Sequence, residues 1–227
     1  MFIRRSLTAP RYNPSSLALG MSLNLALFIV VVIFVVGWFA AGTHYNVRKG
    51  EAALTWLQQG LPLIGGKTTL RWLGSSIVEL KMQSAKAPFR EAEVLVVLEP
   101  RDVAPLWWIA RLRGRRDLLV VRATLQQRPR IELEAHDPKS WTLGAPGKPE
   151  GWESVTAPAP LVALASRSQR AVADALAAAT LEGCPLVRFT VHATAPHLEA
   201  QWRLDQLRKH EPREVFEAMR GIGSLLS

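Results

Sequence analysis

The chain has 227 residues, of which 48% are hydrophobic and 21% are charged, and its 28 lysines and arginines outnumber 19 acidic residues for a net charge of +9. This balance supplies a packed core and excludes a chain that is disordered along its whole length. A single cysteine, Cys184, excludes an intramolecular disulfide. The basic charge suits anionic lipid headgroups, nucleic acid or an acidic protein partner, and solubility alone is the alternative explanation.

The longest apolar run lies in residues 17–42 and extends from Leu17 to Ala41 without a charged residue. Such a run is long enough to cross a hydrocarbon core of about 30 Å as a helix. Cleavable signal peptides have shorter apolar regions of roughly 7–15 residues, and a cut after Ala41 would place the bulky Phe39 at position −3. We therefore expect a retained single-pass anchor in the cell membrane, preceded by an N-terminal flank over residues 1–16. The alternative is a buried core helix.

The charges on either side of the run do not fix its direction. Arg4, Arg5 and Arg11 precede it, while Arg48 and Lys49 follow it closely. Translation from Met21 would remove the three leading arginines and keep the basic domain in the cytoplasm. We expect the soluble domain on the cytoplasmic face.

The soluble part divides into two halves, 43–136 and 161–227, with a connector over 137–160 that is rich in proline and glycine. Periodicity and punctuation by glycine and proline predict alternating helices and strand pairs. In chain order, these are a helix over 47–59, strands near 78–82 and 93–98, a helix over 102–113, strands over 117–125 and 130–136, a helix over 161–182, strands over 186–193 and 198–204, and a helix over 212–220. A connector of this length is a subdomain seam, an insertion or a surface lid.

The expected fold is therefore an α+β domain with a mainly antiparallel sheet and helices on one face. Segment 93–98 (EVLVVL) is apolar on both faces and is predicted to be a central strand. Each strand pair carries a P-x-x-E tetrad, which we interpret as punctuation of a hairpin turn. The tetrads begin at Pro88, Pro129 and Pro196. They suggest an internal duplication of an αββ unit, with chance recurrence as the alternative.

Motifs for catalysis, metals or nucleotides are weak. Segment 60–68 resembles a phosphate-binding loop, but the motif needs a glycine at Leu61 and no strand precedes it. The five histidines form no metal-binding pair of the usual spacing, so we expect neither a metal nor a cofactor. The polar sheet face still offers His136, His192 and Glu199, with Glu132 and Glu134, as candidates if the chain is a membrane-tethered enzyme.

The most informative segment is the helix over 102–113, which is apolar on nearly all sides and runs into a basic cluster. A surface helix ordinarily has one apolar stripe, so this helix needs cover on two sides. Tryptophans beside arginines suit a membrane interface or a protein partner, and a helix clamped between sheet and connector is the alternative. The candidate contact residues are Trp107, Trp108, Arg111, Arg113, Arg115 and Arg116.

Nucleic acid is the weakest of the partners considered. The arginine cluster suits phosphate, but a sheet that binds single strands also presents aromatic rings on its open face. Phe189 and Trp202 fall on the apolar side of their strands instead. We expect a single-pass, membrane-anchored binding or scaffolding protein whose basic domain lies against the lipid bilayer, through anionic headgroups, or against an integral-membrane protein.

Overall fold

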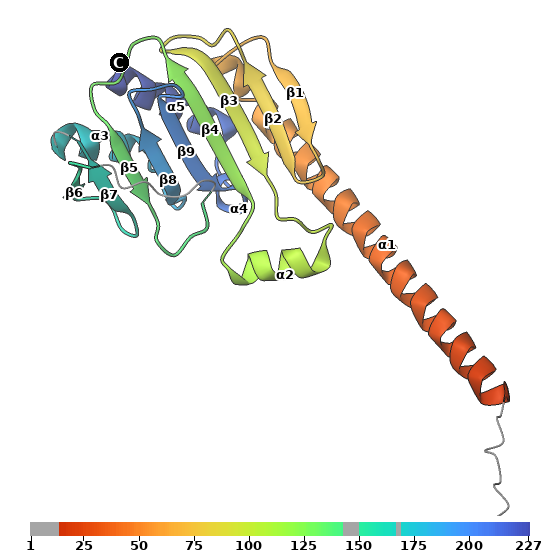
Figure 1. Cartoon of the computed structure of the whole chain (residues 1–227). Helices are drawn as coiled ribbons and strands as arrows, with labels where there is room; N and C mark the ends of the chain where they lie inside the picture. Colours follow the sequence, from red (N-terminus) through yellow and green to blue (C-terminus); the bar gives the residue numbers. More distant parts are fainter. Residues whose placement is uncertain (1–13, 143–149, 167–168) are drawn as a thin grey trace, which may run out of the picture.

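One long helix, α1 (Pro14–Gln58), leads into an α+β domain in the computed structural model, which describes residues 14–142, 150–166 and 169–227 (Figure 1). From Ser22 onward, α1 is long and apolar enough to cross a membrane, a property that signal sequences share. Residues 1–13 of the expected N-terminal flank and residues 143–149 of the connector lie outside the described residues.

The prediction of a separate helix over 47–59 was wrong, because α1 continues through this segment without a break. Gly42 and Gly50 do not end the helix; they allow it to pack closely on the domain. A Cβ atom at Gly42 would overlap the carbonyl of Arg101, and one at Gly50 would meet the ring of Trp72. Glycine is the residue that permits such an approach.

Nine strands in the described residues form one antiparallel sheet, in the order β1-β2-β3-β4-β9-β8-β5-β7-β6. The strands are β1 (Thr69–Leu73), β2 (Ile77–Met82), β3 (Phe89–Val97), β4 (Leu118–Leu125), β5 (Leu133–His136), β6 (Glu153–Val155), β7 (Val162–Ala165), β8 (Leu186–Val191) and β9 (Leu198–Arg203). The remaining helical elements are η1 (Leu61–Leu63), α2 (Ala104–Leu112), α3 (Gln169–Ala179), α4 (Leu204–Leu207) and α5 (Pro212–Leu226).

The main core lies between one face of the sheet and the domain end of α1, α3 and α5. Leu57 of α1, Leu176 of α3 and Phe216 of α5 are fully buried there against strand residues such as Val94 and Trp202. The opposite face is polar except for a small apolar cluster. This cluster contains Leu95 and Val97, whereas Val94 and Val96 belong to the main core, so this end of β3 is apolar on both faces. Helix α2 lies outside both layers, on the side where α1 leaves the domain (Figure 1).

Three strands were not predicted, namely β1, β6 and β7. The helix predicted over 161–182 begins only at Gln169, because Val162–Ala165 is strand β7. Ala163 and Ala165 are buried and alternate with Val162 and Leu164, which are exposed or half-buried. This short alternation was concealed by the alanine-rich sequence that follows it.

The two halves of the soluble part share the sheet. Strand β4 pairs with β9, and β5 pairs with β7 and β8, so β4 and β5 are not neighbours. The tetrad at Pro129 therefore does not mark a hairpin, whereas those at Pro88 and Pro196 precede β3 and β9 in true hairpins. The duplication of an αββ unit stays a prediction.

Candidate functional site

The site is the junction at which α1 meets the domain. Three α1 residues at four-residue spacing face the segment after β3, as one face of a helix requires. Trp38 Nε1 donates a hydrogen bond to the Arg101 carbonyl at 2.9 Å, and Gly42 packs against the same carbonyl. Asn46, which is fully buried, donates from Nδ2 to the Glu99 carbonyl at 3.0 Å. The helix is thus fixed to the domain along two turns.

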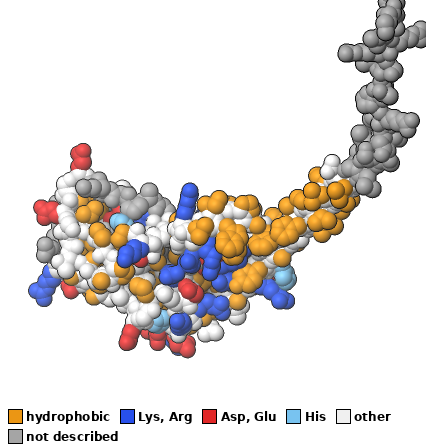
Figure 2. Space-filling view, turned by 90° about the horizontal axis from the view of Figure 1, so that it is seen from below, with side chains coloured by type: hydrophobic (Ala, Val, Ile, Leu, Met, Phe, Trp, Pro, Cys, Tyr) orange, Lys and Arg blue, Asp and Glu red, His pale blue; other side chains and the backbone are white. Residues whose placement is uncertain are grey.

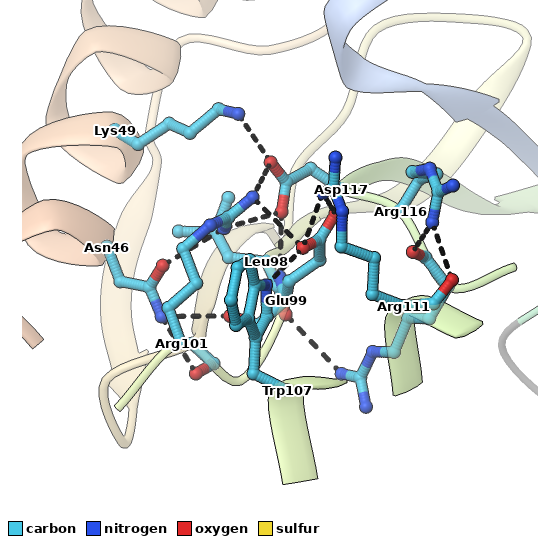
Figure 3. Close-up of polar contacts among 11 residues, drawn as sticks. Asn46, Lys49, Leu98, Glu99, Arg101, Trp107, Arg111, Arg116 and Asp117 are labelled. Carbon is cyan, nitrogen blue, oxygen red and sulfur yellow. Dashed lines mark hydrogen bonds and ion pairs between the residues drawn. The ribbon is translucent and has the colours of Figure 1, made fainter. Parts of the chain in front are cut away.

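Two buried carboxylates, Glu99 and Asp117, organise the polar centre of this junction (Figure 3). Asp117 accepts hydrogen bonds from both terminal nitrogens of Arg101, at 3.0 and 2.9 Å, and lies 2.5 Å from Lys49 Nζ. Burial raises the pKa of Asp117, but the hydrogen bonds from Arg101 and Lys49 outweigh this effect and hold the pKa below its ordinary value. Asp117 is therefore ionised and joins α1 to the domain.

Glu99 performs the corresponding task for α2. Its Oε2 accepts a hydrogen bond from Trp107 Nε1 at 2.6 Å, and both of its oxygens lie 3.2 Å from Arg111 Nη1. The Trp107 ring also packs against Trp38 of α1, with ring centroids 6.1 Å apart. These contacts fix one side of α2 to the junction.

The other side of α2 is uncovered by the described residues, and none of its residues is buried. Large apolar side chains between 43% and 80% exposed lie along it: Val103, Leu106, Trp108, Ile109 and Leu112. The clamped helix considered from the sequence therefore has no counterpart in the described residues. Seen from below, hydrophobic side chains continue from α1 onto the domain, with lysines and arginines beside them (Figure 2).

The six contact residues expected from the sequence differ in where they lie. Trp108, Arg111 and Arg113 are exposed, whereas Trp107 turns inward to Glu99. The guanidinium of Arg115 stacks on Trp141 at 4.6 Å, and burial lowers the pKa of Arg115. Arg116 is half-buried and donates to the carbonyls of Arg111 and Arg115. Three of the six are thus exposed, and the other three are half-buried.

The sequence did not reveal the residues that hold α1 and α2 at the junction, which are Asn46, Lys49, Glu99, Arg101 and Asp117. The sequence feature that could have indicated them is a carboxylate beside each of two apolar strands, with Glu99 after β3 and Asp117 before β4. Because Val97 pairs with Leu118, Glu99 and Asp117 are brought together beyond that pair.

The polar sheet face carries cross-strand ion pairs around an open groove of about 610 Å³. Arg122 on β4 pairs with Glu199 on β9 at 2.6 Å, and Lys81 lies 3.1 Å from Glu79 on the same strand. Burial and the neighbouring Glu79 raise the pKa of Glu93, whereas a hydrogen bond from Glu93 lowers the pKa of Glu79. These charges largely compensate one another.

His136, His192 and Glu199 do not meet at one point. His136 on β5 pairs with Arg188 on β8. His192 lies four residues after Arg188, just beyond the end of β8, which is about 13 Å along an extended strand. Glu199 is opposite Thr190 and holds Arg122, while His192 lies near Trp152. Their positions form no catalytic constellation by themselves.

Across residues 14–142, 150–166 and 169–227, no group of three or more His, Cys, Asp or Glu side chains is placed to hold a metal ion. No protein-family model matches the chain, and no curated protein matches it.

Proposed function

We propose that the chain is a single-pass membrane protein in which α1 holds the exposed side of α2 against the bilayer, so that the basic domain serves as a binding or scaffolding module at the membrane surface. The observation that carries this proposal is the junction of α1 and α2. Trp107, on the attached side of α2, packs on Trp38 near the end of the apolar run, and the other side of α2 presents the exposed apolar side chains.

The depth of α2 follows from the length of α1. The run from Leu17 to Ala41 extends about 37 Å as a helix, which exceeds a hydrocarbon core of about 30 Å. Trp38 then lies at the boundary between hydrocarbon and headgroups, where an indole ring is favoured. Since Trp107 packs on Trp38, α2 lies at the same boundary. A short helix with exposed tryptophan, leucine and isoleucine suits that depth.

The same geometry favours a retained anchor over a cleaved signal sequence. A cut at the end of the apolar run would divide a continuous helix and remove Trp38, which hydrogen-bonds to the domain. The residues beyond the cut, such as Leu57, belong to the domain core. Anchor and domain are therefore parts of one folded unit.

The cytoplasmic face is the proposed side of the membrane. Five basic residues lie on the domain side near the boundary: Arg48, Lys49, Arg111, Arg113 and Arg116. Positive residues next to a span are favoured on the cytoplasmic side, where the leaflet is also anionic. Reporter fusions at Ser227 test this: a reporter active only in the cytoplasm should be active, and activity of a reporter that needs export would contradict the assignment.

A depth measurement tests the membrane contact. A nitroxide label is attached at Leu112→Cys in the full chain in lipid nanodiscs, with Leu225→Cys on α5 as the matched control, because both leucines are strongly exposed. Cys184 is buried and burial raises its pKa to about 11, so the native thiol does not compete for the label near pH 7. We expect molecular oxygen to relax the Leu112 label and a water-soluble nickel complex to relax the Leu225 label. Equal exposure of both labels to the nickel complex would refute the contact.

A further inference from the structure

A small cavity of about 190 Å³, open to the surface, lies between α1 and α2. Its lining residues are Trp38, Ala41, Gly42, Tyr45, Arg101 and Trp107. Aromatic rings from both helices form its walls. Apolar cavities of about 150 Å³ admit a benzene-sized molecule, whereas a helix is about 10 Å across. The cavity therefore accommodates a segment of hydrocarbon chain and excludes a partner helix.

The cavity is continuous with the apolar surface of the span. Phe34, 62% exposed, packs against the Trp38 wall with ring centroids 6.0 Å apart. One turn separates Phe34 from Trp38, and the residues between them are apolar. Hydrophobic side chains continue from α1 onto the domain (Figure 2), so a hydrocarbon chain lying along α1 would reach the cavity over the apolar surface at Phe34 and Trp38.

Cations lie beside both aromatic walls. The guanidinium of Arg111 is 5.8 Å from the Trp107 ring centroid and is about half exposed. Arg113 follows it at the end of α2 and is exposed. On the other wall, Lys49 Nζ is 6.0 Å from the Tyr45 ring centroid. An apolar cavity next to exposed guanidinium groups is complementary to a lipid with a hydrocarbon chain and an anionic headgroup.

We propose that this cavity binds one hydrocarbon chain of an anionic phospholipid whose phosphate contacts Arg111 and Arg113. The inference rests on the proposed function, since it places the cavity at the depth of the headgroups. The bound lipid would fill the space between α1 and α2 and join the anchor to the domain's membrane-facing side.

Native mass spectrometry of the full chain in mild detergent tests the site. Phosphatidylglycerol and phosphatidylcholine with the same chains are titrated separately. We expect one phosphatidylglycerol to be retained with a preference of at least about tenfold, the effect expected of two arginines at a membrane surface. Equal retention of the two lipids would overturn the anionic headgroup. No retained lipid would overturn the site and leave a side chain of a partner protein as occupant.

Paired variants separate the cavity from general lipid adhesion. Ala41→Phe places a ring in the cavity, whereas Ala40→Phe places the same ring on an adjacent exposed position that does not line it. We expect Ala41→Phe to lose the retained lipid and Ala40→Phe to keep it. Equal retention by both variants would overturn the cavity as the site.

A second pair does not depend on filling the cavity. Arg111→Gln with Arg113→Gln should abolish the preference for phosphatidylglycerol, whereas Arg213→Gln with Arg220→Gln, two exposed arginines of α5, should preserve it. An unchanged preference in the first double variant would overturn the assigned phosphate contacts.

The Leu112 label distinguishes the two proposals. A label in water refutes the membrane contact, while a label in the bilayer with lipid still bound to Ala41→Phe refutes only the lipid site.

Discussion

At the scale of single residues, the junction depends on two carboxylates that are almost fully buried. Glu99 is 2% exposed and Asp117 is 5% exposed, and Arg101 contacts both. Burying an ion is unfavourable unless its partners remain in place, so removing one partner leaves the others uncompensated. The cluster therefore determines whether α1, α2 and the sheet stay together.

Asp117→Asn should destabilise the full chain by about 3–5 kcal/mol, because Arg101 and Lys49 lose a buried counter-ion. Asp205→Asn, at an exposed position of α4, is the matched control and should change stability by about 0.5 kcal/mol or less. Denaturant unfolding in detergent measures both. Similar midpoints for the two variants would contradict the role given to Asp117.

Acid should weaken the same cluster. The pKa of Asp117 is lower in the folded state, so its contribution is complete above the ordinary aspartate value of about 3.9 and is lost as pH falls towards the folded-state pKa. We expect the stability difference between the native chain and Asp117→Asn to shrink between pH 5 and pH 3. A constant difference would contradict the depressed pKa.

His197 gives a second pH dependence near neutrality. Burial, followed by Arg90 and Arg128, lowers its pKa, and its Nδ1 accepts a hydrogen bond from the Leu125 amide at 3.1 Å. The unfolded chain is protonated first as pH falls through about 6.5, so this contribution to stability declines below that pH. The free energy of unfolding should change less between pH 7.5 and pH 5.5 in His197→Gln than in the native chain. An equal difference would exclude His197 as the source.

At the scale of elements, α1 and α2 are held by close packing as well as by charge. Gly42→Leu should force α1 away from the Arg101 carbonyl and destabilise the chain by about 1–3 kcal/mol. Gly37→Leu is the matched control, because a Cβ there meets nothing within 4 Å and the gain in helix propensity is the same. Amide hydrogen exchange of residues 98–103 should accelerate in the first variant alone.

The sequence predicted elements where a pattern persisted over several residues. Strands β2, β8 and β9 alternate clearly, and the two apolar faces of β3 identified it as a central strand. Strand β6 has three residues and β7 has four, so their alternation is too short to separate from loop or helix. Tertiary pairing, not local preference, makes these segments strands.

The candidate site was predictable only in part, for a related reason. Helix α2 was identified because its sequence is apolar on two sides, which local periodicity reveals. Its attachment depends on Asn46, Glu99 and Asp117, which are far apart in the sequence and meet only through the sheet register and the course of α1. Local hydrophobic periodicity carries no information about contacts between residues that are distant in the sequence.

At the scale of the whole molecule, the two halves of the soluble part depend on each other. Strand β5 from residues 43–136 lies between β7 and β8 from residues 161–227. Its buried Leu133 and Ala135 belong to the shared core. We expect fragments 1–136 and 161–227 each to lack cooperative unfolding in detergent, because each loses an interior strand pairing. Cooperative unfolding of 161–227 alone, measured by circular dichroism, would contradict this.

If α1 spans the bilayer as proposed, its unbroken course would make the orientation of the domain depend on bilayer thickness. A span longer than the surrounding hydrocarbon layer tilts to keep its apolar residues covered. Because α1 is one continuous helix from Ser22 to Gln58, a change in its tilt would rotate the domain by the same angle, and in the proposed arrangement it would move one end of α2 away from the headgroups. The surface that the domain offers to the cell would then differ between thin and thick membranes of identical charge.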